Sequence, residues 1–293
     1  MRRRFSHRLF PVLTFFLFAT LSSPIPASGQ SLLWKLEGKD LAGASYLYGT
    51  IHAICPADVV IGDEITAAVG NSARIALELD LDDPRLLVEM GHISFLPRDS
   101  TLRNYFSAED YDFVESWFKD SVGLSLAPMN NIRPLFLFGL LIGRLLECKP
   151  QSYEELFMAM ARAQGKDVIG LETPAEQMAA FSRIPPRVQA TMVVTMLRNM
   201  DSTRANFGAL TELYRTRDVE ALYQFMLDSG IEYGRYDTEL LTKRNQTWIP
   251  RIIEFAEEKP TFIAVGAGHF GGPHGLLALL RQQGYSVTPV MSE

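Results

Sequence analysis

The chain has 293 residues, of which 28 are Lys or Arg and 34 are Asp or Glu, so its formal net charge is −6. This acidic balance argues against a nucleic-acid-binding protein and against attraction to an anionic membrane surface. A chain of this length in which 47 % of the residues are apolar can bury a sizeable core.

The first 29 residues have the layout of a secretory signal peptide. A basic start, "MRRR", precedes the apolar run "LFPVLTFFLFATLSS" and the small-residue exit "IPASG". Cleavage before Gln30 would leave residues 30–293 as one domain in the periplasm or outside the cell. The segment carries four arginines and no acids, so the remaining chain is more acidic than the whole. The alternative to cleavage is an uncleaved signal anchor, which would be the one attachment to a membrane.

The first half of the domain predicts a hairpin and then mostly helices. Two strands, at 31–38 and 46–49, are joined by a polar turn; a helix within 58–72, a strand at 73–81 and a helix from about Pro84 follow. Residues up to about 163 show periodic apolar and charged positions that are typical of helices. The run "LFLFGLLIGRLL" at 135–146 is too short to cross a bilayer and contains Arg144, which indicates a buried helix.

In the second half of the domain, the sequence predicts strands near the beginning and near the end. A strand ends near Glu172, and Pro174 suits the first turn of a new helix. A helical block extends to about Lys259, and a strand from 261, a helix at 273–284 and a strand at 285–290 complete the chain. Strands that alternate with helices predict an α/β fold: a mainly parallel sheet with an N-terminal hairpin and large helical insertions.

The chain has two cysteines, Cys55 and Cys148. In an exported protein they are candidates for a disulfide, because such bonds persist outside the cytosol. The alternative is a pair of buried free thiols that pack as small apolar side chains.

Unusual polar residues follow the predicted strands. The second strand of the hairpin leads into Gly49-x-x-His52, and the strand from 261 leads into Gly266-x-x-His269. Glycine permits a sharp turn at a strand end, so each histidine can point back over the sheet edge. The other histidines of the domain are His92, to which we assign no role, and His274, which we expect in the first turn of a helix and treat as a secondary candidate for lining the site.

Three carboxylates occupy similar positions after strands: Glu78, Asp80 and Glu172. Functional residues gather at the carboxyl ends of strands in open α/β sheets. Imidazole and carboxylate are ligands of zinc, and they also suit manganese, iron and cobalt. The alternatives are hydrogen-bonded structural histidines and acids that solvate a strand end.

A competing pattern, Gly266-x-Gly268-x-x-Gly271, matches a dinucleotide-binding fingerprint. Only one short strand follows it, and no acid stands at the position that would bind the ribose. The sequence therefore favours a metal site over a nicotinamide or flavin site.

Five ordered blocks resemble one known family. "LYGTIH", "ALELD", "GKDVIGLETPAEQ", "KRNQTWIPRI" and "AVGAGHFGGPHGLLALLRQQGYSVTPV" are similar to the TraB/GumN family, which is related to the Tiki proteases and more widely to erythromycin esterase and the haem-binding ChaN proteins. The resemblance implies a divalent transition metal (Mn, Co, Zn or Fe) held by His52 and His269, with Glu78 as a further ligand. It also implies site roles for Arg244, with Asn245 beside it, and for Glu172.

One departure concerns the block "KPQSYEEL", where many members have a glycine before an acid. Here Ser152 and Glu154 occupy those places, so the acid is kept and the glycine is lost. We give Glu154 a supporting part.

These residues predict an exported metal-dependent hydrolase, a Tiki-like peptidase acting on a peptide or protein of the cell envelope. A metal would activate water and polarise the carbonyl, Glu78 or Glu172 would accept a proton, and Arg244 would stabilise the oxyanion. The alternatives are a non-catalytic periplasmic protein that binds a peptide, a metal or haem at the same place, and a structural role in the envelope. In those cases Arg244 could be a surface salt-bridge partner.

Overall fold

The computed structural model describes residues 30–228 and 232–291, so the predicted signal peptide lies outside the described residues. Six strands form one sheet in the order β4-β3-β5-β2-β1-β6. The strands are β1 (Leu33–Glu37), β2 (Ser45–Thr50), β3 (Arg74–Leu77), β4 (Asp167–Gly170), β5 (Thr261–Gly266) and β6 (Ser286–Pro289). β2, β5, β3 and β4 are parallel neighbours, and β1 is antiparallel to both β2 and β6. The predicted hairpin and mainly parallel sheet are confirmed.

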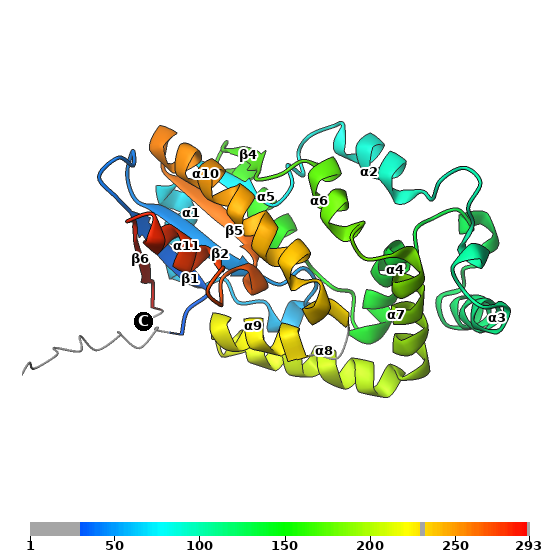
Figure 1. The fold of residues 1–293 in the computed structure, drawn as a ribbon. Coiled ribbons are helices and arrows are strands. Elements are labelled where there is room, and N and C mark those ends of the chain that lie inside the picture. Colours follow the sequence, from blue (N-terminus) through cyan, green and yellow to red (C-terminus); the bar gives the residue numbers. More distant parts are fainter. Residues whose placement is uncertain (1–29, 229–231, 292–293) are drawn as a thin grey trace, which may run out of the picture.

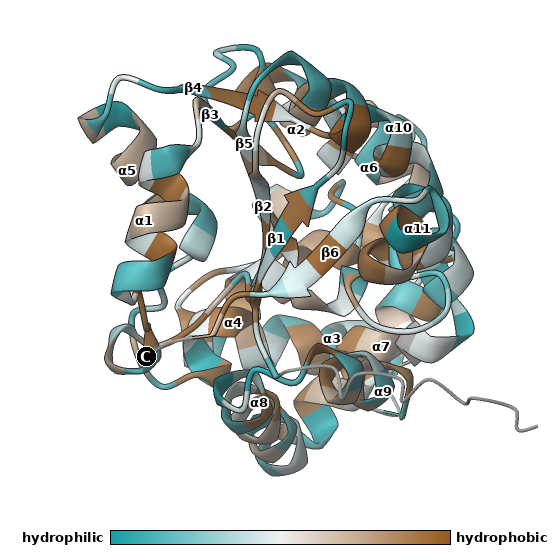
Figure 2. Ribbon diagram, turned by 90° about the vertical axis from the view of Figure 1, so that its left-hand side faces the viewer, coloured by the Kyte–Doolittle hydropathy of each residue, from teal (hydrophilic) through white to brown (hydrophobic). Residues whose placement is uncertain are grey.

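The central strands are buried on both faces. Every residue of β3 is buried, and β5 is buried from Thr261 to Val265. Such near-continuous apolar strands are typical of parallel sheets that helices cover on both sides. Figure 2 shows this arrangement, with α1 (Asp63–Asn71) and α5 (Tyr153–Ala163) on one side of the sheet and α10 (Lys243–Glu258) and α11 (Leu276–Gln282) on the other.

The remaining helices form a lobe beside the sheet (Figure 1). This helical lobe consists of α2 (Leu86–Ser94), α3 (Ala108–Trp117), α4 (Leu135–Leu145), α6 (Pro174–Phe181), α7 (Pro186–Arg198) and α8 (Met200–Arg215), and α9 (Val219–Asp228) follows it. The lobe has its own apolar cluster, separate from the one around the sheet. In α4 the buried side chains are Leu137, Leu141 and Leu145, one helical turn apart, which confirms a buried helix. Within residues 30–228 and 232–291, none of the helices combines the length and the apolar character needed to cross a membrane.

Local signals explain where several helices begin. Ser107 accepts a hydrogen bond from the N–H of Asp110 at the start of α3. At α6, Thr173 and Glu176 form a reciprocal capping box, and Pro174 is the first helical residue. Glu172 is thereby fixed directly before a well-defined helix start.

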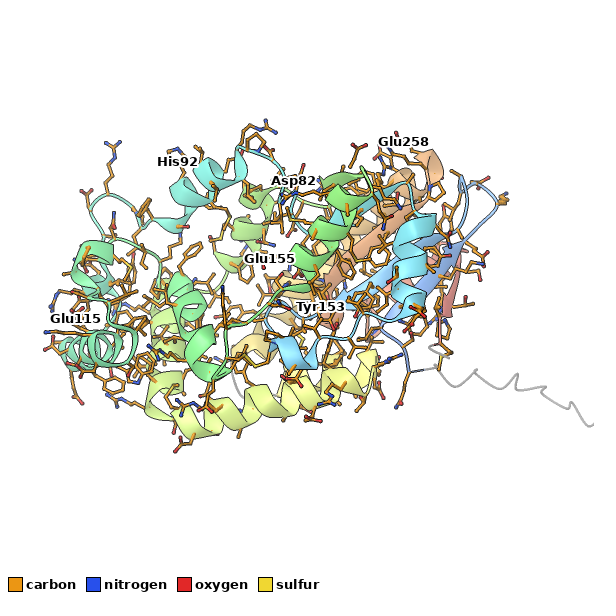
Figure 3. The ribbon with its side chains drawn as sticks, turned by 180° about the vertical axis from the view of Figure 1, so that it is seen from behind. Asp82, His92, Glu115, Tyr153, Glu155 and Glu258 are labelled. Atoms are coloured by element: carbon orange, nitrogen blue, oxygen red, sulfur yellow. A yellow bond between two sulfur atoms is a disulfide. The ribbon has the colours of Figure 1, made fainter. Side chains whose placement is uncertain are left out.

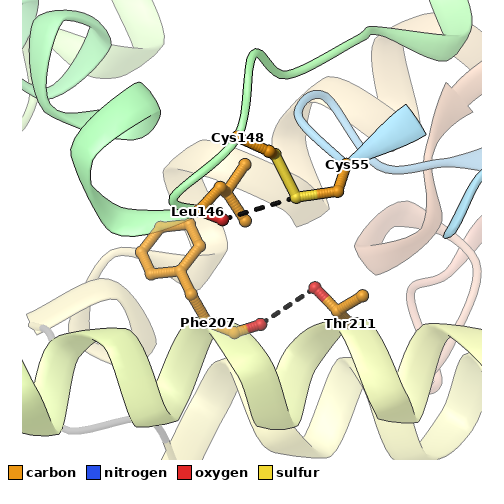
Figure 4. Close-up of a disulfide and its surroundings, with 5 residues drawn as sticks. All are labelled: Cys55, Leu146, Cys148, Phe207 and Thr211. Atoms are coloured by element: carbon orange, nitrogen blue, oxygen red, sulfur yellow. Dashed lines mark hydrogen bonds between the residues drawn. A yellow bond between two sulfur atoms is a disulfide. The ribbon is translucent and has the colours of Figure 1, made fainter. Parts of the chain in front are cut away.

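A disulfide joins the strand region to the helical lobe. Cys55 and Cys148 are bonded with a Cα–Cα distance of 5.9 Å, and Cys55 Sγ lies 3.4 Å from the carbonyl oxygen of Leu146 (Figure 4). The predicted pairing is confirmed. The bond ties the segment after β2 to the connection between α4 and α5.

Candidate metal-binding and catalytic site

The two Gly-x-x-His turns lie side by side at the carboxyl edge of the sheet. β2 and β5 pair in parallel, with Thr50 opposite Gly266, so both strands end at the same edge. His52 follows β2 by two residues, and His269 ends a short 3₁₀ turn, Ala267–His269, directly after β5. The His52 side chain is 65 % exposed and that of His269 is 5 % exposed, so one imidazole is open and the other is enclosed.

Each imidazole is held through its Nδ1 atom. His52 Nδ1 lies 2.9 Å from Glu154 Oε1, and His269 Nδ1 lies 2.6 Å from Asn245 Oδ1. Both oxygens accept hydrogen bonds, so Nδ1 carries the proton and Nε2 is the nitrogen left for another partner when the ring is neutral. A hydrogen bond of this kind fixes both the tautomer and the ring orientation of a metal-binding histidine.

The two supporting residues are themselves fixed. Glu154 also accepts hydrogen bonds from the hydroxyl groups of Thr50 (2.7 Å) and Ser152 (2.6 Å). Asn245 donates from Nδ2 to the carbonyl oxygens of His269 (3.1 Å) and His274 (2.9 Å). The orientation of the two rings therefore depends on a buried carboxylate from α5 and a buried amide from α10.

Glu78 stands between the two histidines, one residue beyond the end of β3. Its Oε1 lies 3.9 Å from both His52 Nε2 and His269 Nε2 and accepts the backbone N–H of Gly266 at 2.9 Å. A Cβ atom at Gly266 would lie 3.4 Å from Glu78 Oε1 and 3.4 Å from His52 Nε2. The missing side chain of Gly266 thus leaves open the space that the three groups face.

Arg244, in the first turn of α10, contacts both His269 and Glu78. It donates from Nη2 to Glu78 Oε2 (2.6 Å) and to Glu172 Oε1 (2.6 Å), and its Nη1 lies 3.1 Å from His269 Nε2. Its guanidinium stacks on Trp248, which donates to Glu172 from Nε1 at 3.2 Å. Arg244, Glu78 and Glu172 are all buried, so these are desolvated ion pairs rather than surface contacts.

The surroundings of His52 and His269 shift their pKa values in opposite directions. The atoms packed around His52 lower its pKa, but the hydrogen bond to Glu154 and the charges of Glu78 and Glu154 outweigh them and raise the pKa to about 9. Burial, together with the positive charge of Arg244, lowers the pKa of His269 to about 3. At neutral pH His269 is therefore uncharged, and without a metal His52 carries a proton that a metal would have to displace.

The carboxylates are also shifted. Burial raises the pKa of Glu78, but the charges of Arg244 and His52 and the hydrogen bond from the backbone of Gly266 outweigh it and hold the pKa well below its ordinary range. For Glu172 burial dominates and raises the pKa despite the bonds to Arg244. Two neighbouring carboxylates thus differ in proton affinity, which is a common feature of acid–base sites.

A cavity of about 640 Å³ opens in front of these groups. His52, Glu78, Glu154, Arg244 and His269 form a polar part of its wall. The rest is largely apolar and comes mostly from the helices, including Phe181, Phe207, Leu210, Leu222, Met226 and Leu241. Glu172 is not part of this wall, because it lies behind Arg244.

The donor types around the Gly266 space fit a divalent metal. Two imidazole nitrogens and one carboxylate oxygen make up a known catalytic zinc set, in which neighbouring ligands of a tetrahedral ion lie about 3.4 Å apart. The distances of 3.9 Å here are slightly wider, and Arg244 contacts both His269 and Glu78. Accordingly, within the described part of the chain no group of three His, Cys, Asp or Glu side chains is already arranged to hold a metal ion.

The structure brings together most of the site residues that the sequence predicts. Glu154 has a larger part than we predicted, since it binds His52 directly; its place in a family-like block was the available signal. Gln177, which donates to Glu78 Oε2 at 3.3 Å, was missed as a site residue; its place at the end of the block "GKDVIGLETPAEQ" was the available signal.

Three other polar residues that the sequence analysis considered are not part of the cavity wall. Asp80 caps a turn by accepting the N–H of Asp82, away from the cavity. His92 is exposed on α2 (Figure 3). The prediction for His274 was wrong in its position: it precedes α11 instead of lying in its first turn, because the helix begins only after Gly275.

Comparisons with known proteins identify the family to which the chain belongs. The TraB/PrgY/gumN family matches residues 32–289. Among curated relatives, Metalloprotease TIKI2 of Danio rerio is 27 % identical, covering 88 % of this chain and 60 % of its own length. The Metalloprotease TIKI homolog of Amphimedon queenslandica is 23 % identical, covering 89 % and 62 %, and Metalloprotease TIKI1 of Homo sapiens is 24 % identical, covering 88 % and 61 %.

The chain thus spans about three fifths of the length of these curated relatives. No solved structure matches it significantly. The family match covers nearly all of residues 30–293 and includes both Gly-x-x-His turns, Glu78 and Arg244. The chain belongs to the TraB/PrgY/gumN family.

Proposed function

We propose that the protein is an exported metal-dependent peptidase. One observation carries the proposal: the Nε2 atoms of His52 and His269 both lie 3.9 Å from the same oxygen of Glu78, at the wall of a large cavity. Similarity to proteins named metalloproteases supports it. The disulfide and the layout of residues 1–29 support export.

His52, His269 and Glu78 would hold a divalent ion such as Mn, Co, Zn or Fe. When bound, the ion would polarise a peptide carbonyl and lower the pKa of a water molecule. Glu154 and Asn245 keep the two rings aimed at the cavity. Glu78 Oε1 faces the cavity and would serve as a ligand, whereas Glu172 lies too far behind Arg244 to accept a proton in the cavity.

Arg244 would act on the substrate by charge. It contributes to the cavity wall, and its guanidinium would stabilise negative charge that develops on a carbonyl oxygen. The apolar side chains opposite would receive an apolar side chain of the peptide next to the cleaved bond. The substrate class is therefore a peptide or protein segment of the cell envelope with bulky apolar residues.

The first test is metal binding by the purified protein, followed by peptide cleavage. Titrations with zinc, manganese, cobalt and iron should show one ion per chain, and the His52→Ala and His269→Ala variants should lose it while remaining folded. His92→Ala is the matched control, because His92 is exposed on α2, and its binding should be unchanged.

Cleavage of apolar peptides that requires the ion would establish the peptidase. Stoichiometric binding without any hydrolysis would instead leave a metal-binding protein of the same fold. Absence of binding for all four metals would exclude the proposed chemistry.

A further inference from the structure

The side chain of Arg244 bonds two of the three groups that would hold the metal. Its Nη1 lies 3.1 Å from His269 Nε2, the nitrogen that has no other hydrogen-bond partner once Nδ1 is bonded to Asn245. Its Nη2 lies 2.6 Å from Glu78 Oε2. A guanidinium carries one positive charge, so in this arrangement it supplies the cation that the imidazole and the carboxylate face.

Arg244 has a second carboxylate partner outside the cavity. Its Nε lies 3.2 Å from both oxygens of Glu172, and its Nη2 lies 2.6 Å from Glu172 Oε1. Trp248 holds the same carboxylate through Nε1. Glu172 can therefore keep the guanidinium paired and buried after Glu78 and His269 have been taken by another cation.

We propose that Arg244 is a built-in competitor of the metal, and that Glu172 is the group to which it withdraws when the metal binds. The inference rests on the proposed function, since it assumes that His52, His269 and Glu78 bind the ion. In the metal-free protein Arg244 neutralises Glu78 and holds the site together. If Glu78 and His269 held an ion, Arg244 would remain bonded to Glu172.

The proposal predicts opposite effects for two neighbouring residues. Arg244→Gln removes the competing charge, so affinity for zinc should rise about ten-fold or more, the order expected when a hydrogen bond to a charged group is removed. Glu172→Gln keeps Arg244 but weakens its alternative partner, so Arg244 holds Glu78 more strongly and zinc affinity should fall.

The double variant separates this role of Glu172 from simpler ones. If Glu172 acts only through Arg244, Glu172→Gln should have no effect on zinc affinity once Arg244 is also changed to Gln. If Glu172 is itself a ligand, or acts by long-range charge alone, its substitution should weaken binding equally in both backgrounds. Arg244→Gln alone removes the cationic partner of two buried carboxylates, Glu78 and Glu172, whereas the double variant does so for Glu78 only. The double variant should therefore be less destabilised than Arg244→Gln.

The measurement is calorimetric titration of zinc into wild type, both single variants, the double variant and Arg251→Gln, with folding checked by circular dichroism. Arg251 is a control on the same helix, because it pairs with Glu176 and contacts none of the three groups. Should Arg244→Gln not fold, the double variant is compared with Glu172→Gln, and about ten-fold tighter binding is again expected.

The outcomes are distinguishable from those of the proposed function. Wild type that binds zinc, with no tighter binding when Arg244 is replaced, overturns the competitor role and leaves the metalloenzyme standing. Wild type that binds none, with binding gained in the Arg244→Gln protein, supports the competitor role and counts against a metal-dependent activity of the native protein. No binding in any variant overturns both.

Discussion

The glycines of the two Gly-x-x-His turns look equivalent in the sequence, but they do different things. A Cβ at Gly49 would lie 3.1 Å from the Cα and Cβ atoms of Ala267, which is too close without a shift of the backbone. A Cβ at Gly266 would meet site atoms at 3.4 Å, which is ordinary contact, and its φ of −49° is open to any residue. The first glycine permits the two turns to pack, and the second leaves room at the site.

Alanine substitutions at these two glycines should therefore affect different properties: protein stability at Gly49 and zinc binding at Gly266. Gly49→Ala should lower the free energy of unfolding by about 1–3 kcal/mol, the usual cost of overpacking. Gly266→Ala should unfold like wild type but bind zinc weakly, since its methyl group fills the space between His52 and Glu78. Urea denaturation and zinc titration check both. Gly139→Ala in α4 is the control, because an added Cβ there would meet no described atom within 4 Å apart from its chain neighbours and the backbone of its own helix. Equal loss of stability in the two variants would contradict the distinction.

Glu154 should matter to metal binding although it would not touch the metal. Glu154→Gln keeps the shape of the side chain but removes the charge that holds His52 Nδ1–H, and loss of such a partner typically weakens metal affinity about 10- to 100-fold. The comparison is zinc affinity against Glu155→Gln, whose side chain is exposed on the same helix (Figure 3). An unchanged affinity would show that His52 needs no such support.

These residue roles could be predicted from the sequence only in part. His52, Glu78, Arg244 and His269 stand in recognisable blocks, so their importance could be inferred. That His52 is bonded to Glu154, 102 residues away, depends on how α5 packs under the sheet edge. The link from Glu172 through Arg244 likewise follows from the placement of α10, which sequence spacing does not reveal.

At the scale of single elements, α6 begins one residue after Thr173 and fixes Glu172 behind the site. Thr173→Ala removes the side-chain acceptor for the N–H of Glu176 and should cost about 1 kcal/mol of stability. Glu176→Gln keeps the capping box and loses only the charge paired with Arg251, a partly exposed pair, so its cost should stay below about 1 kcal/mol. Urea denaturation of both variants checks this order, and a reversed order would show that the ion pair dominates.

The elements themselves were largely predictable, but their arrangement was not. Apolar periodicity located the hairpin, the central strands and the buried helix at 135–145. Periodicity contains no information on which strands become neighbours, and the pairing of β5 with both β2 and β3 is a tertiary property. Short irregular helices, such as the π-helical turn Thr238–Thr242 directly before α10, also lack a sequence signal.

For the whole molecule, the disulfide closes a segment with a sequence separation of 93 residues that contains β3, Glu78 and half of the helical lobe. Replacing both cysteines by serine should lower the free energy of unfolding by about 2–4 kcal/mol, because the unfolded chain regains the conformational freedom that the disulfide removes. Reduction of wild type should have the same effect, and the double variant should not respond to the reductant. Stability that is independent of oxidation state would exclude a stabilising role for the bond.

The position of β5 in the sheet limits how far the protein can fold during its synthesis. β5 lies between β2 and β3 although it is among the last segments of the chain to be synthesised. Until residues 261–269 have emerged, β2 and β3 lack their common neighbour and expose unpaired backbone edges, and the second histidine turn does not yet exist. A nascent or prematurely terminated chain therefore lacks both the completed sheet edge and the second imidazole, and its exposed strand edges make it prone to aggregate.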